Sequence, residues 1–299
     1  MAVGELKTIV MTMRIPFLLL SPVCVFLGAA AAYATTGDFD CFDFGLIVLA
    51  ALAAHISVNT LNEYSDYRSG LDTITKRTPF SGGSGGLLMH PEVLDKVKLV
   101  AYLSLLMSVG IGFYFVFQVG AQLIPIGLVG VGVILSYTDV LNKRPYLCLV
   151  APGLAFGPLF VVGTFVILTG HYSWVAWMIS MVPFFLVNNL LLLNQIPDIE
   201  ADSASGRKHI PIVYGIQFSV LFYVLFVSLT VFTLSLGVYW QYLPLRSLWS
   251  LLPLSLVVVI APGVWNHGAQ VERLIPYLGL NVVMTLLSPV ILAVSLLYG

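Results

Sequence analysis

The chain has few charged residues. Only 9% of its 299 residues are Asp, Glu, Lys or Arg, whereas 59% are hydrophobic. A soluble domain carries roughly 25% charged residues, so this composition excludes an ordinary soluble fold and indicates an integral membrane protein in a lipid bilayer. The formal net charge of −1 identifies no partner by itself, and we expect no nucleic acid among the partners.

Cysteine is also scarce. The three cysteines, Cys24, Cys41 and Cys148, show no C-x-x-C spacing. This excludes a disulfide framework and a cysteine-based zinc site, both of which need several cysteines at regular separations. We expect all three thiols to pack in the interior as small apolar groups.

Apolar stretches fill most of the remaining sequence. Each is close to the roughly 20 residues that a helix needs to cross hydrocarbon. The first could also be interpreted as a secretory signal peptide, but its length favours a span. The sequence therefore predicts an all-α integral membrane protein, one domain over residues 1–299, with nine transmembrane helices around a central cavity. The predicted spans are 15–33, 44–66, 97–118, 121–138, 146–169, 173–196, 215–239, 247–265 and 274–298.

The positions of the basic residues predict the orientation. If the amino terminus is cytoplasmic, only Arg246 falls outside, which leaves 12 of the 13 Lys and Arg residues inside. Cytoplasmic loops of membrane proteins carry such an excess of bases. We therefore expect a multi-pass protein of the cell (inner) membrane, with its amino terminus and polar loops in the cytoplasm and its carboxyl terminus on the opposite side.

A polar motif, N-T-L-N-E-Y-S-D-Y-R-S-G-L-D over residues 59–72, closes the second span. On a helix, His55, Asn59, Asn62 and Asp66 follow one another at i, i+4, i+7 and i+11 and so share one face. Polar groups on one stripe of a membrane helix avoid lipid and face a protein interior or a wet cavity. His55 lies deeper and is also explained as an interior histidine, and Asn59 as a bond between helices.

A second polar motif, N-Q-I-P-D-I-E-A-D-S-A-S-G-R-K over residues 194–208, closes the sixth span. Asn194, Asp198 and Asp202 step by four, whereas Glu200 points the other way. The two motifs end spans four apart, which predicts two four-helix pseudo-repeats plus one helix, with both motifs at a shared pocket.

Two carboxylate-bearing helix ends favour a divalent-metal site. Mg²⁺ takes oxygen ligands and is usually shared between one or two carboxylates and substrate phosphates. The predicted metal ligands are Asn62, Asp66, Asp72, Asp198 and Asp202, although Asp72 could equally be a solvated residue beyond the helix.

Basic residues near the motifs could bind phosphate oxygens. The predicted substrate-binding residues are Asn59, Arg77, Lys143, Arg144, Asn194, Arg207 and Lys208, and Lys208 is also predicted to be catalytic together with Asn62, Asp66, Asp198 and Asp202. Lys143 and Arg144 are explained as well by topology anchoring. Asn188 and Gln195 share the arc of the second motif and either line the pocket or bond between helices.

A glycine-rich segment, Ser81–Gly86, lies in the longest polar connection. It lacks the G-K-[ST] ending of a phosphate-binding P-loop. We interpret it as part of a lid over the site, with a plain linker as the alternative. Carboxylates and bases at a membrane surface, above an apolar interior, suit a substrate with a diphosphate head and a long hydrocarbon tail.

The two motifs resemble the aspartate-rich motifs of the UbiA superfamily of membrane-embedded aromatic prenyltransferases. The residues that carry the resemblance are Asn59, Asn62, Asp66 and Asp72, and then Asp198 and Asp202. The segments Arg77–Pro79, Phe156–Leu159 with Gly163–Thr164, and Asp198–Asp202 are most similar to the branch that prenylates 1,4-dihydroxy-2-naphthoate in menaquinone synthesis. The sequence departs from the family pattern at Glu63, where Asp is common, and at Gly70.

The resemblance implies Mg²⁺-dependent transfer of a polyprenyl chain from a prenyl diphosphate to an aromatic acceptor, with release of pyrophosphate. A naphthoate acceptor would also lose its carboxylate. Other members of the family use 4-hydroxybenzoate, homogentisate, a chlorophyll-type ring or a glycerol-phosphate lipid, and these stay open as alternative acceptors. An ion-coupled secondary transporter is the alternative from another class, but transporters place ionisable groups near the bilayer midplane rather than at one face.

Overall fold

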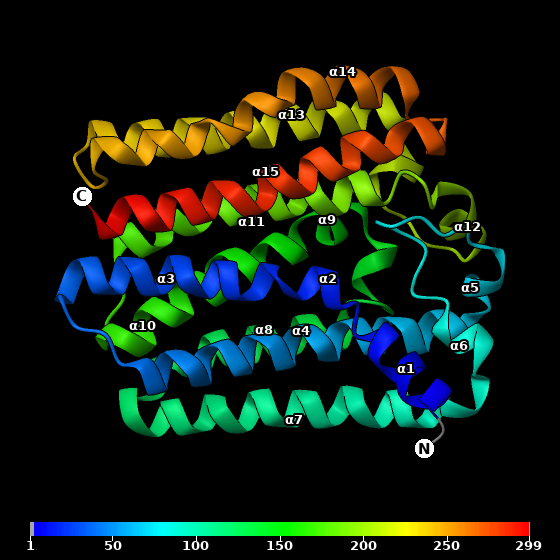
Figure 1. Ribbon diagram of the computed structural model, residues 1–299, viewed down its shortest axis with the longest axis horizontal. Coiled ribbons are helices and arrows are strands. Elements are labelled where there is room, and N and C mark those ends of the chain that lie inside the picture. The colour runs from blue at the N-terminus through cyan, green and yellow to red at the C-terminus, as the bar shows by residue number, and fades with distance from the viewer. Residues whose placement is uncertain (1–2, 299) are drawn as a thin grey trace.

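The computed structural model describes residues 3–298, and within that range all regular structure is helical (Figure 1). An apolar chain in lipid must satisfy its backbone hydrogen bonds internally, which a helix does within one segment. The six longest helices lie roughly parallel and form the body of the molecule. They are α3 (Leu20–Thr36), α4 (Cys41–Ser69), α7 (Leu94–Val119), α11 (Trp174–Asn194), α13 (Ile210–Tyr239) and α15 (Val271–Leu297).

Two further rods are composite. One joins α9 (Pro145–Leu154), the π-helix η4 (Ala155–Val162) and α10 (Gly163–Thr169), and the other joins the 3₁₀-helices η5 (Leu245–Leu251) and η6 (Pro253–Leu256) to α14 (Val257–His267). Prolines inside both rods, including Pro152 and Pro158, interrupt the regular hydrogen bonding and explain the changes of helix type. The remaining elements are α1 (Val3–Thr12), α2 (Ile15–Leu18), α5 (Leu71–Ile74), α6 (Gly86–Met89), η1 (Pro91–Val93), η2 (Ala121–Leu123), α8 (Ile124–Ser136), η3 (Leu141–Lys143) and α12 (Ile199–Ala204).

Eight helical segments of the described chain are long and apolar enough to cross a membrane. They correspond to eight of the nine predicted spans. The segment predicted at 121–138 forms a shorter apolar helix, Ala121–Ser136, so its crossing stays a prediction. The two termini lie at opposite ends of the bundle (Figure 1). The arrangement as two pseudo-repeats also stays a prediction.

Small residues allow the central helices to approach closely. A Cβ added to Gly153 of α9 would lie 2.2 Å from the Phe184 carbonyl oxygen of α11, and one added to Gly28 of α3 would lie 2.5 Å from the Val161 carbonyl oxygen. Asn188 adds a polar link, because its Oδ1 accepts a 2.6 Å hydrogen bond from the Gly153 backbone N–H. Close packing of small residues and interhelical hydrogen bonds hold membrane helices together in the absence of a hydrophobic drive between them.

Gly153→Ala should destabilise the bundle by about 1–3 kcal/mol, because the added methyl group overlaps the backbone of α11 and forces the two helices apart. The measurement is the thermal unfolding midpoint of the purified protein in detergent. Gly110→Ala on α7 is the matched control, since its Cβ would meet nothing within 4 Å. An unchanged midpoint for Gly153→Ala would mean that this crossing is looser than its geometry indicates.

The short elements α1, α5, α6 and α12 gather at one end of the bundle, together with the amino terminus (Figure 1). There a small apolar cluster joins Ile9 of α1 to Leu87 of α6, to Val93 at the end of η1 and to Val97 in the first turn of α7. The expectation for the cysteines was wrong in one case. Cys24 and Cys148 are buried, but Cys41 is exposed because it begins α4 directly after a polar turn.

Candidate active site

The first motif lies on α4 and faces a cavity of about 670 Å³. His55, Asn59, Asn62 and Asp66 all line this cavity, as their spacing along one helix face predicts. The helix ends at Ser69 because Gly70 adopts a left-handed conformation with φ of 78°. This turn starts α5 and brings Asp72 to the cavity wall as well.

The second motif begins where α11 ends at Asn194. A short turn follows, and Asp198 precedes the first residue of α12, so that Asp198 and Asp202 lie one helical turn apart. Asn194, Asp198 and Asp202 all line the same cavity as the first motif, whereas Glu200 is exposed on the other side of α12. The structure therefore brings the two motifs to one end of one cavity.

Arg207 connects the two motifs directly. Its Nη2 forms an ion pair with Asp66 Oδ1, and its Nη1 donates to Asp202 Oδ1 at 2.9 Å. The other oxygen of Asp202 lies 2.7 Å from His209 Nε2. All four side chains line the cavity, so a cation already bridges carboxylates from α4 and α12.

The glycine-rich segment covers this polar end. Phe80, Ser81, Gly82 and Gly83 line the cavity, and the Gly82 N–H donates to Asp198 Oδ2 at 3.0 Å. Gly82 and Gly83 have φ values of 82° and 71°, which only glycine adopts without strain. This placement agrees with the interpretation of the segment as a lid.

Several oxygen atoms at this end have no hydrogen-bond partner although they are buried. They are Asp72 Oδ2, Asn194 Oδ1 and Asp198 Oδ1. Buried acceptors normally have a donor, and carboxylate and amide oxygens are the ligands that Mg²⁺ prefers. Across residues 3–298, no three His, Cys, Asp or Glu side chains come together at metal-ligand distances, and Arg207 pairs with both Asp66 and Asp202. The oxygen donors at this end therefore fit Mg²⁺ when Arg207 gives up one of its ion pairs with Asp66 and Asp202.

Burial and neighbouring charge alter the acidity of these groups. Burial first, and then the charge of Asp202, raise the pKa of Asp198 to about 7. Burial and the charge of Glu63 raise the pKa of Asp72 to about 6. Both directions are expected where burial and neighbouring carboxylates outweigh the opposing effect of nearby arginines on the pKa.

Four of the predicted phosphate-binding bases lie outside the cavity lining. Lys143, Arg144 and Lys208 have exposed side chains. Arg77 turns back on its own loop, where it donates to the Asp72 carbonyl oxygen at 3.0 Å and packs against Gly85. Arg207 is the one base of the predicted set that lines the cavity in the described chain.

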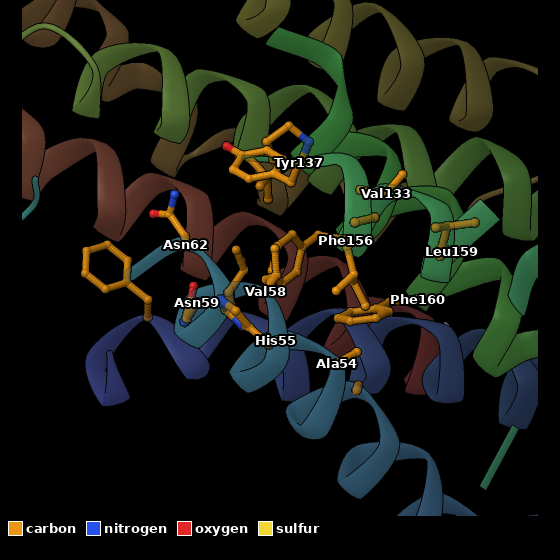
Figure 2. A pocket seen from close by; sticks show the side chains of 18 of the residues that line it. Ala54, His55, Val58, Asn59, Asn62, Val133, Tyr137, Phe156, Leu159 and Phe160 are labelled. Atoms are coloured by element: carbon orange, nitrogen blue, oxygen red, sulfur yellow. The ribbon is translucent and has the colours of Figure 1, made fainter. Parts of the chain in front are cut away.

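The deeper part of the cavity is apolar. Figure 2 shows His55, Asn59 and Asn62 of α4 near Tyr137 and Phe156, with Val133, Leu159 and Phe160 farther along. His55 Nδ1 lies 2.9 Å from Ser21 Oγ, and the His55 ring meets Phe156 edge-on at 4.9 Å. A polar end above an apolar chamber can hold a molecule with a charged head and a hydrocarbon tail.

The structure also bears on the residues with two explanations. Asn59 donates to the Met13 carbonyl oxygen at 3.0 Å and also lines the cavity, so it makes a structural bond and its contact with substrate stays a prediction. Asn188 bonds between helices, as described above, and is absent from the cavity lining. Gln195 lines the cavity and donates to Cys148 Sγ at 3.2 Å.

Three cavity residues were missed by sequence reasoning. Arg14 is one of the 12 basic residues predicted on the cytoplasmic side, and it lines the cavity beside α4. Tyr137 lies at the end of the predicted span 121–138, and His209 lies in the connection after the second motif; both face Arg207 or its partners. The position of His209 directly after Arg207 and Lys208 was the available signal, because a histidine close to an acidic motif often binds its carboxylates.

Residues 21–274 match the model of the UbiA prenyltransferase family. The chain belongs to this family. Its relative in *Bacillus subtilis*, 1,4-dihydroxy-2-naphthoate octaprenyltransferase, is 31% identical over 183 residues. That alignment covers 59% of this chain and 56% of the relative, so little more than half of the relative's length is matched.

Solved UbiA homologues share the fold. One from *Aeropyrum pernix* K1, in its apo form, superposes with a TM-score of 0.71 at 16% identity and covers 94% of this chain and 98% of its own. One from *Archaeoglobus fulgidus*, bound to DMAPP and Mg²⁺, has a TM-score of 0.61 at 14% identity and covers 96% of this chain and 99% of its own. At these identities the likeness establishes the UbiA helical architecture alone.

Proposed function

We propose that this UbiA-family protein transfers a prenyl chain from a prenyl diphosphate to an aromatic acceptor, with Mg²⁺ bound between the two acidic motifs. The observation that carries the proposal is the convergence of Asp66, Asp198 and Asp202 with Arg207 at the polar end of one apolar cavity. A diphosphate head suits the polar end and an isoprenoid tail suits the chamber below it. The UbiA homologue that binds DMAPP and Mg²⁺ supports both ligands.

The proposed metal ligands are Asn62 and Asp66 on α4 and Asp198 and Asp202 at α12, with Asp72 in reach of the same end of the cavity. When bound, Mg²⁺ neutralises diphosphate charge and makes pyrophosphate a better leaving group. Arg207 then moves from its carboxylate partners towards the diphosphate, where its guanidinium offers bidentate hydrogen bonds to phosphate oxygens.

The chain's own residues act on both halves of the reaction. The carbon–oxygen bond of the prenyl diphosphate breaks, and its electron pair leaves with pyrophosphate, where Arg207 stabilises the developing charge. The apolar wall of Phe156, Leu159 and Phe160 keeps water from the cationic carbon. A ring carbon of the acceptor then forms the new bond and loses its substituent, either a proton or, for a naphthoate, the carboxylate as CO₂.

The acceptor we favour is 1,4-dihydroxy-2-naphthoate, which would place the protein in menaquinone biosynthesis. The support is the similarity to the *Bacillus subtilis* octaprenyltransferase, together with the segment Phe156–Leu159, of which Phe156 and Leu159 line the cavity. Asn59 and His55 offer hydrogen bonds to hydroxyl groups on such a ring. We further propose that the polar end faces the cytoplasm of the cell (inner) membrane.

The deciding experiment incubates the purified protein with Mg²⁺, geranyl diphosphate and one acceptor at a time, followed by mass spectrometry of the products. The acceptors are 1,4-dihydroxy-2-naphthoate, 4-hydroxybenzoate, homogentisate and glycerol 1-phosphate lipids. We expect a prenylated, decarboxylated naphthoquinol as the main product. If only 4-hydroxybenzoate gave a product, the proposed prenyl transfer would stand and the acceptor would be 4-hydroxybenzoate instead of the naphthoate. Absence of any prenylated product and of pyrophosphate, also with longer prenyl diphosphates, would contradict the proposal.

Mg²⁺ binding should strengthen as pH rises from 6 to 8. Asp198 has a pKa of about 7 without metal, so it is mostly protonated at pH 6 and mostly ionised at pH 8. Mg²⁺ binds the ionised carboxylate and displaces the proton, so this residue alone should lower the apparent Kd by about tenfold over that range. Isothermal titration at several pH values measures the slope, and Asp198→Asn should flatten it. A slope unchanged by the substitution would exclude Asp198 as the titrating ligand.

A further inference from the structure

Glu63 is the one acidic residue of the first motif that does not line the cavity. It is 2% exposed and lies on α4 between the proposed ligands Asn62 and Asp66. Its carboxylate is fully engaged by neighbours. Oε1 accepts from the Ser84 N–H at 2.8 Å, and Oε2 accepts from the Ser84 hydroxyl at 2.6 Å. Arg14 Nε completes the set at 3.1 Å from Oε1.

These partners belong to two segments that cover the polar end of the cavity. Ser84 follows the loop residues Phe80, Ser81, Gly82 and Gly83 that line the cavity. Arg14 lies at the break between α1 and α2, where its own backbone adopts a left-handed conformation with φ of 55°. A non-glycine residue in this conformation is under strain and persists only where its surroundings hold it.

The two covering segments also pack on each other. Ile9 of α1 and Leu87 of α6 meet in the small apolar cluster at this end of the molecule. The amino-terminal helix and the glycine-rich loop therefore form one cover, which we call the roof (residues 3–14 and 80–89). Glu63 pairs with Arg14 in one half of the roof and bonds to Ser84 in the other half. It therefore links both halves to α4, the helix that carries the first motif.

We propose that Glu63 is a positioning residue that holds the roof closed over the reacting carbon, rather than a metal ligand. The inference rests on the proposed prenyl transfer and assigns Glu63 a separate task within it. A closed roof keeps water from the cationic carbon after pyrophosphate leaves. With the roof loosened, water adds at that carbon and loses a proton to solvent. The product is then a prenyl alcohol in place of the prenylated acceptor.

We measure how well the roof excludes water by the fraction of geranyl diphosphate that is converted to geraniol. This fraction does not depend on how much of the protein is folded, so a merely destabilising substitution leaves it unchanged. We expect the ratio of geraniol to pyrophosphate to rise about threefold in Ser84→Ala, which loses the neutral hydroxyl that bonds to Glu63. The ratio should rise about tenfold in Glu63→Gln, which loses the charged carboxylate that bonds to both Ser84 and Arg14. The reaction contains Mg²⁺ and whichever acceptor the wild-type protein prenylates fastest.

Ser65→Ala is the matched control. Ser65 lies two residues further along α4, and its hydroxyl bonds to Asp139 at 3.3 Å outside the cavity. It should leave the ratio unchanged. Equal ratios in Glu63→Gln, Ser84→Ala and Ser65→Ala would overturn the inference. So would a Glu63→Gln protein that loses Mg²⁺ affinity at an unchanged ratio, because Glu63 would then act as a ligand.

A second readout does not depend on activity. Trypsin cleaves after Lys76 and Arg77, which are exposed just before the roof loop. We expect faster cleavage there in Ser84→Ala than in Ser65→Ala, measured on the full-length protein in detergent. If the wild-type protein releases no pyrophosphate, the proposed function fails, while the cleavage rates still decide whether Glu63 and Ser84 hold the roof. Equal cleavage rates would contradict the inference.

Discussion

Asp198→Asn should reduce the rate of prenyl transfer by at least about 10²-fold, because loss of one group that stabilises transition-state charge typically has an effect of this size. The substitution keeps the shape of the side chain and the acceptor for the Gly82 N–H, but it removes the negative charge beside Asp202. The expected loss therefore lies in Mg²⁺-dependent chemistry and not in folding. Initial rates at saturating prenyl diphosphate, measured over a range of Mg²⁺ concentrations, test it.

Glu200→Gln is the control for this result. It lies in the same motif and makes the same change from acid to amide, but its side chain is exposed on the opposite side of α12. Its rate should match that of the wild-type protein. Thermal unfolding of both variants separates lost chemistry from lost structure. Full activity of Asp198→Asn would remove the second motif from the metal site and with it the proposed mechanism.

The convergence of the two motifs could be predicted from the sequence because it depends on helix periodicity. Each motif carries a pair of polar residues four positions apart at the end of an apolar helix. The pairs are Asn62 with Asp66 and Asp198 with Asp202. Polar groups in that pattern face inward in a membrane protein. Local rules of this kind do not require knowledge of how distant helices pack, and the structure places both pairs on the same cavity.

The orientation of individual bases could not be predicted in the same way. Arg207 and Lys208 are adjacent and carry the same charge, yet Arg207 enters the cavity and Lys208 is exposed. The difference arises from the turn after α12, where Gly206 has φ of 80° and the Lys208 N–H donates to the Asn142 carbonyl oxygen at 3.0 Å. That carbonyl belongs to a distant connection, so the choice depends on tertiary structure.

Dependence on tertiary structure also explains why the orientation of Arg77 and the length of α8 could not be predicted from the sequence. Arg77 turns away from the cavity because its guanidinium packs on Gly85 and bonds to the Asp72 carbonyl, contacts that positive-φ glycines make possible. The apolar run at 121–138 is predicted to be a full span; the structure starts it with a 3₁₀ turn at Ala121 and ends its helix at Ser136, so its crossing stays a prediction. Composition predicts apolar surroundings better than it predicts helix length.

Arg207→Gln should have the largest effect on stability in the absence of metal. Arg207 pairs with both Asp66 and Asp202, and all three side chains are at most 15% exposed. Removal of one partner leaves buried carboxylates without compensation, which typically destabilises a protein by about 3–5 kcal/mol. The variant should also lose about 10²-fold in kcat/KM for the prenyl diphosphate, because the guanidinium that pairs with both Asp66 and Asp202 would no longer be there to stabilise the diphosphate.

Mg²⁺ should restore part of the stability that Arg207→Gln loses. A divalent cation bound by Asp66 and Asp202 compensates the same charges that Arg207 compensates, and ligand that binds only the folded state stabilises it. Millimolar Mg²⁺ should therefore raise the unfolding midpoint of Arg207→Gln more than that of the wild-type protein, while the turnover defect persists. Arg273→Gln, an exposed arginine with no ion pair in the described chain, should show neither effect. Equal Mg²⁺ stabilisation of all three proteins would mean that Arg207 and the metal do not share the carboxylates of α4 and α12.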